Sequence, residues 1–130
     1  MIYYIADNHF GHKNVIRFDN RPFADTVLMD EVLVHNWNER VTEDDTVYIL
    51  GDCFWKNEEN SVKLIQRLKG HKHLIRGNHD RVHGRLRFYY ESIEHYAEIN
   101  DNDRLVILCH YPIPFYKNQH YGAVMLYGHV

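Results

Sequence analysis

The sequence TVYILGD, residues 46–52, joins a run of β-forming apolar residues to a glycine and an aspartate. A short apolar run bounded by a turn residue is typical of a buried strand, and we expect a strand over Thr46–Leu50. Gly51 and Asp52 stand at the point where this strand ends. The stretch therefore delivers a carboxylate from the end of a buried strand.

Two further runs have the same form. The apolar run Met1–Ala6 stops at Asp7, and His73–Arg76 is followed by the polar residues Gly77–Asp80. Both runs predict strands that are closed by polar or glycine residues. Three predicted strands thus end in side chains that are able to bind a metal.

Helices are predicted between these strands. One is expected to begin at Asp25 or Thr26, either of which can cap it, and to run to about Arg40. A second is expected over Glu59–Leu68, with Gly70 at its C-terminal end. Strands that alternate with helices predict a parallel α/β sheet, whose sites lie at the carboxyl ends of the strands.

The second half of the chain predicts another group of strands. Residues 81–90 are expected to be irregular or weakly helical, and 96–99 and 104–109 read as two strands of a hairpin around a turn at 100–103. A last strand is expected over Ala123–Tyr127. The second hairpin strand would deliver His110, and the last strand would deliver His129.

The polar residues at these strand ends form a donor set for two divalent ions. Two ions about 3.5–4 Å apart repel each other, and a bridging carboxylate lowers that repulsion. Asp52 is the natural bridge, because Gly51 allows the main chain to turn sharply. Mixed carboxylate, amide and imidazole ligands suit Mn, Fe, Zn, Co or Ni. The candidate ligands are Asp7, His9, Asp52, Asn78, His110 and His129.

In order and approximate spacing, five segments resemble the signature of the calcineurin-like metallophosphoesterases, in particular a group of small bacterial and phage phosphoesterases. The segments are Asp7-Asn8-His9, Gly51-Asp52, Gly77-Asn78-His79-Asp80, Cys109-His110 and Gly128-His129. The resemblance implies an α/β fold, a two-sheet αββα sandwich with mixed sheets. It also implies hydrolysis of a small phosphorylated substrate, monoester or diester, by a dinuclear metal centre.

The same resemblance implies roles for individual residues. Asp7 and His9 would bind the first ion, Asp52 would bridge, and the second ion would be completed by Asn78, His110 and His129. His79 would protonate the leaving oxygen. Asp80 would either orient His79 or cap the helix that follows.

Two positions and the end of the chain are open to more than one interpretation. His12 would contact substrate or be a solvated loop residue, and Arg21 would hold a phosphate or form a surface ion pair. The family motif is Gly-His-x-His, whereas this sequence stops at Val130, one residue before the final histidine. We therefore expect residues 1–130 to be a single domain that lacks its C-terminal strands.

Composition narrows the class of protein. With 45% hydrophobic and 25% charged residues, the chain has the balance of a soluble globular domain. A net charge of −3 gives no support to capture of nucleic acid by a basic surface, so a nuclease is a weaker alternative. No apolar run approaches the ~20 residues of a membrane span, and the start of the sequence lacks the basic-then-apolar pattern typical of a signal peptide. With only two cysteines, a cytoplasmic location is expected. The other alternative is a non-catalytic interaction scaffold of the same fold; nothing in the sequence indicates an oligomeric state.

Overall fold

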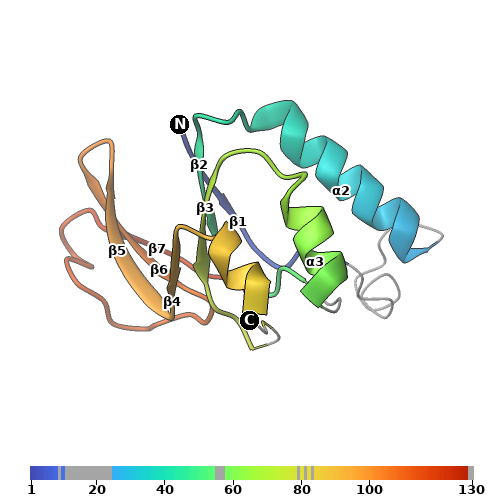
Figure 1. The fold of residues 1–130 in the computed structure, drawn as a ribbon. Helices are drawn as coiled ribbons and strands as arrows, with labels where there is room; N and C mark the ends of the chain where they lie inside the picture. Colours follow the sequence, from blue (N-terminus) through green and yellow to red (C-terminus); the bar gives the residue numbers. More distant parts are fainter. Residues whose placement is uncertain are drawn as a thin grey trace.

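The computed structural model describes residues 1–8, 10, 25–54, 58–78, 80, 82 and 84–128. Within them the chain forms two β-sheets with helices on one side (Figure 1). The sequence also predicts a short helical turn at 14–18, and this segment lies outside the described residues. The broad prediction of an α/β protein with two sheets is confirmed.

The first sheet is parallel and has four strands. It consists of β1 (Ile2–Ile5), β2 (Thr46–Ile49), β3 (His71–Ile75) and β4 (Ser92–Glu94), in the order β1-β2-β3-β4. The first three strands confirm the predicted ones, with β3 beginning two residues earlier. The sequence did not predict β4, because three residues with one apolar member give no strand signal.

Two α-helices and a 3-10 helix cover one face of this sheet. They are α2 (Thr26–Arg40), α3 (Glu58–Ile65) and η1 (Gly84–Tyr89). Asp25 caps α2 as predicted, since its carboxylate accepts a hydrogen bond from Leu28 N at 2.8 Å. The α-helical part of α3 ends three residues before the predicted Leu68, because the chain continues in tighter turns.

The first core cluster lies between these helices and the parallel sheet. Apolar side chains of α2 and α3 are buried there, including Trp37 and Ile65. Leu86 of η1 joins the same cluster. Residues 84–89 of the region predicted as irregular or weakly helical therefore form a short 3-10 helix, in which Leu86 is buried.

The second sheet has three strands, β5 (Tyr96–Asp101), β6 (Arg104–Cys109) and β7 (Val124–Leu126). The predicted hairpin is confirmed: β5 and β6 are antiparallel, and Asn102 and Asp103 both have positive φ, as a tight two-residue turn requires. β7 pairs with β6 in parallel, so this sheet is mixed.

A second core cluster lies between the two sheets. Leu50 and Ile75 at the ends of parallel strands pack against Val106 and Leu108 of β6. The layers are therefore helices, parallel sheet and mixed sheet, as Figure 1 shows. Within the described ranges no helix packs on the outer face of the mixed sheet, where an αββα sandwich would have one. None of the described helices is long and apolar enough to cross a membrane.

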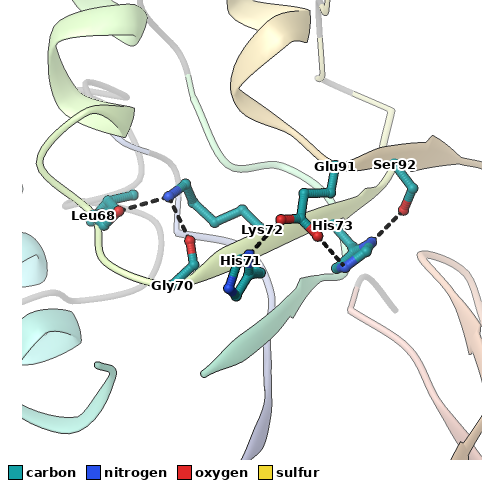
Figure 2. A network of polar contacts seen from close by, with 7 residues as sticks. All are labelled: Leu68, Gly70, His71, Lys72, His73, Glu91 and Ser92. Atoms are coloured by element: carbon teal, nitrogen blue, oxygen red, sulfur yellow. Dashed lines mark hydrogen bonds and ion pairs between the residues drawn. The ribbon is translucent and has the colours of Figure 1, made fainter. Parts of the chain in front are cut away.

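A network of polar side chains links β3 to Glu91 and Ser92 at the start of β4. Figure 2 shows the Glu91 carboxylate between two imidazoles: it contacts His71 Nδ1, and its Oε2 lies 3.5 Å from His73 Nε2. Ser92 Oγ lies 2.6 Å from His73 Nδ1. Lys72 Nζ donates hydrogen bonds to the carbonyl oxygens of Leu68 and Gly70, which follow α3. Burial lowers the pKa of its amine. His71 and His73 thus both have polar partners in the folded chain.

Candidate metal centre

The carboxyl ends of β1 and β2 continue side by side into the loops that carry the candidate ligands. Asp7 N donates to Gly51 O at 3.0 Å, and Phe10 N donates to Cys53 O at 2.8 Å. The rings of Phe10 and Phe54 then stack with centroids 5.3 Å apart. The parallel pairing of the two strands therefore extends beyond their ends and holds Asp7 next to Gly51-Asp52.

Three candidate ligands converge at this edge of the fold. One ligand atom from each of Asp7, Asp52 and His110 lies within 4.8 Å of the other two. Asp52 is 2% exposed and His110 is fully buried. Two carboxylates that close together in a largely buried place repel each other, and a cation or a protonated imidazole between them offsets that repulsion.

His110 is oriented by a main-chain carbonyl. Its Nδ1 lies 2.6 Å from Leu50 O, which can only accept, so Nδ1 carries the hydrogen of this bond. Its Nε2 lies 3.1 Å from Asn78 Oδ1 and 3.3 Å from Asp52 Oδ2. A histidine that donates from one nitrogen to a carbonyl and presents the other to oxygen ligands has the arrangement found in metal sites.

Both candidate aspartates have a strained main chain. Asp7 has a φ of 55° and Asp52 a φ of 53°, in the left-handed region that disfavours residues with a Cβ. Such conformations persist where the surroundings hold them, and they cluster at functional sites. In each case the strain falls on the residue that supplies the carboxylate.

Glycine is required where the loops meet. Gly51 has a φ of 90°, and a Cβ added there would overlap His110 Nδ1 and lie 2.7 Å from Gly77 Cα. A Cβ added to Gly77 would lie 2.6 Å from Asp52 Oδ1. These glycines therefore let Asp52, Asn78 and His110 approach one another.

The Asp80 side chain is bound by main-chain groups beside the centre. Its buried carboxylate accepts hydrogen bonds from the main-chain N–H groups of Asp52, Cys53 and Gly77. All three donors precede it in the chain, so these bonds do not cap a following helix. Sequence patterns do not predict these bonds, because every non-proline residue carries the same main-chain donor.

The remaining predicted site residues divide into two groups. Asn78 is exposed and reaches the centre through its side-chain oxygen. Five residues lie outside the described part of the chain: His9, His12, Arg21, His79 and His129. Gly128, the neighbour of His129, donates from its N to His110 O at 3.0 Å, so β7 does lead toward the centre.

The two cysteines contribute no ligand to this group. Cys53 is fully buried, and burial, followed by the nearby charge of Asp80, raises the pKa of its thiol well above the usual value. Cys109 is partly buried. A cavity of about 460 Å³ between β1 and α2 touches Asn8 but is lined by none of the converging ligands, so it is separate from the centre.

The donor set fits a divalent transition metal. It offers carboxylate oxygens from Asp7 and Asp52, an imidazole nitrogen from His110 and an amide oxygen from Asn78. This mixture of oxygen and nitrogen donors suits Mn, Fe, Zn, Co or Ni. Together the four described residues offer enough donor atoms for one such ion.

Comparison with known proteins supports the fold without naming an activity. No family model matches the chain. An uncharacterized protein of Methanocaldococcus jannaschii is 42% identical over 88 residues, which are 66% of this chain and 50% of that protein. The Gene 66 proteins of Mycobacterium phages L5 and D29 are 38% and 33% identical over 85 residues, 62% and 63% of this chain and 40% and 41% of theirs. The chain thus spans about half the length of these relatives or less.

A solved structure is also similar. The crystal structure of a protein of unknown function from Aquifex aeolicus has a TM-score of 0.73 and 30% sequence identity, covering 92% of this chain and 66% of that one. The fold described above is therefore shared with an experimentally determined protein.

Proposed function

We propose that this chain is a metal-dependent phosphoester hydrolase of the calcineurin-like metallophosphoesterase kind. The observation that carries the proposal is the convergence of Asp7, Asp52 and His110, with ligand atoms within 4.8 Å of one another. Asn78 adds a neutral oxygen at the same place. These four side chains follow the order of the family's motifs along the chain. The proposal implies the αββα sandwich of that family, three layers of which correspond to those described above.

The described residues would hold the ions. Bound divalent ions supply a water of lowered pKa and neutralise charge on phosphoryl oxygens. Asp52 is the proposed bridge because its carboxylate lies with both Asp7 and His110. His110 would bind through Nε2, since Nδ1 is bonded to Leu50 O.

The remaining roles rest on the resemblance alone. His9 and His129 would complete the ligand sets, and His79 would donate a proton to the leaving oxygen. His12 and Arg21 would contact the phosphorylated substrate.

Hydrolysis of p-nitrophenyl phosphate and bis-p-nitrophenyl phosphate, with and without Mn²⁺, tests the proposal. We expect Mn²⁺-dependent turnover of at least one substrate, and a loss of about 100-fold or more in Asp52→Asn. Asp103→Asn is a matched control, since it removes one charge in an exposed hairpin turn where asparagine tolerates the φ of 66°. A wild-type chain that neither turns over these esters nor takes up Mn²⁺ would favour a non-catalytic scaffold.

A further inference from the structure

The Asp80 side chain joins the loop after β2 to the loop after β3. Its Oδ2 accepts hydrogen bonds from Asp52 N at 2.8 Å and Gly77 N at 2.7 Å, and its Oδ1 accepts one from Cys53 N at 3.1 Å. Asp80 is 9% exposed. Three donors offset the burial of a carboxylate, and bonds to a charged acceptor are stronger than bonds to a neutral one.

These contacts act on the candidate ligands themselves. Asp52 holds a left-handed φ that disfavours a residue with a Cβ by about 1 kcal/mol or more, and its own N–H is bound to Asp80. Gly77 N, also bound to Asp80, immediately precedes Asn78. Asp80 therefore contacts both loops within one residue of a candidate ligand.

We propose that Asp80 is a positioning residue of the centre, and this rests on the proposed function. Its carboxylate fixes the spacing of the loop carrying Asp52 and the loop carrying Asn78, and thereby prepares both side chains to bind divalent cations. Arg76 supports it from the same loop, because its guanidinium donates to Asp80 O at 3.4 Å. Gly77 permits the contact, since a Cβ there would lie 2.8 Å from Asp52 N.

Calorimetric titration of Asp80→Asn with Mn²⁺ tests this role. The amide keeps the shape of the side chain but replaces one acceptor oxygen with a donor that faces main-chain N–H groups. We expect Mn²⁺ affinity to fall by about 10–100-fold, the effect typical of groups that orient ligands. Mn²⁺ affinity equal to that of the wild type would overturn the proposal, whereas a wild type that binds no Mn²⁺ would contradict the proposed function instead.

Asp45→Asn is the matched control. The Asp45 carboxylate also accepts three hydrogen bonds, from the Met1 amino group at 3.0 Å and from Thr42 N and Oγ1 at 2.8 and 3.1 Å. It lies before β2, at the opposite end of that strand from Asp52. We expect Asp45→Asn to lose stability and to keep wild-type Mn²⁺ affinity. A loss of affinity equal to that of Asp80→Asn would assign the effect to general destabilisation and overturn the proposal.

Hydrogen exchange in the wild type tests the same contacts if Asp80→Asn does not fold. The N–H groups of Asp52, Cys53 and Gly77 lie outside helices and strands, yet we expect them to exchange as slowly as those of β2 and β3. Exchange as fast as that of the exposed hairpin turn 102–103 would overturn the proposal.

Discussion

Replacing Gly51 with alanine tests the close packing of the candidate centre. The added Cβ would overlap His110 Nδ1 and lie 2.7 Å from Gly77 Cα. Neither neighbour is the free end of a flexible side chain, because Gly77 contributes main chain and His110 Nδ1 is bonded to Leu50 O at 2.6 Å. The substitution therefore has to displace a loop or break that hydrogen bond.

The magnitude follows from three terms. A left-handed φ of 90° disfavours alanine by about 1–2 kcal/mol. Overpacking contributes about 1–3 kcal/mol, and losing the His110–Leu50 hydrogen bond contributes about 1 kcal/mol. We expect Gly51→Ala to lower the free energy of unfolding in urea by about 3–6 kcal/mol. Mn²⁺ uptake should be lost in any fraction that stays folded.

Gly122→Ala separates the steric terms from the conformational one. Gly122 has a φ of 89°, and a Cβ added there would meet nothing within 4 Å. Gly122→Ala should therefore lose only the unfolding free energy that arises from the left-handed φ. The two variants should differ by about 2–4 kcal/mol in unfolding free energy. If both variants lose the same free energy within about 0.5 kcal/mol, the described approach of Gly51 to His110 is refuted.

Three further predictions follow from the centre and from the β3–β4 junction. Asp7→Asn should raise the unfolding free energy of the metal-free protein by about 1 kcal/mol or more, because it relieves repulsion with Asp52. It should also remove the increase in melting temperature that Mn²⁺ causes. A metal-free variant that is less stable than the wild type would contradict this prediction. His79→Ala should keep Mn²⁺ affinity and lose about 100-fold or more in turnover, and an unchanged rate would remove its role as an acid. Burial is the main cause that lowers the pKa of His73 below its ordinary value of 6.5, while the nearby Glu91 raises it. The His73 imidazole therefore binds a proton more readily in the unfolded chain than in the folded one. The contribution of neutral His73 to folding stability is present above pH 6.5 and is lost as the pH falls below that value. His73→Gln should flatten this part of a melting profile measured from about pH 5.5 to 7.5, and an unchanged profile would contradict this.

The sequence predicted most of the secondary structure because its elements are long enough to show a pattern. The face of α3 and the runs that became β1 and β2 each carry several apolar residues at the required spacing. β4 has no such pattern. It forms because Glu91 N donates to Lys72 O at 2.8 Å and places Ser92–Glu94 in parallel register beside β3. That pairing depends on the tertiary fold, which no local periodicity encodes.

The candidate centre was predictable in its side chains but not in its main-chain supports. Asp7, Asp52 and His110 each follow a predicted strand, and the structure brings them together. The carbonyl of Leu50 that orients His110, and the N–H groups bound by Asp80, belong to the main chain. Their roles depend on the directions of loops, which the identity of a residue does not specify.

The centre combines several features that oppose folding, and this has a thermodynamic consequence. Asp7 and Asp52 have left-handed main chains, and their carboxylates share a small space with a buried imidazole. The bonds to Asp80 offset part of this cost whether or not a cation is bound. A cation that binds only the folded chain offsets the rest, and at 100 times its dissociation constant it adds about 2.7 kcal/mol. Asp7→Asn and Asp80→Asn should therefore change the stability of the metal-free protein in opposite directions while both weaken Mn²⁺ binding, because one removes a charge that opposes folding and the other removes a support for it.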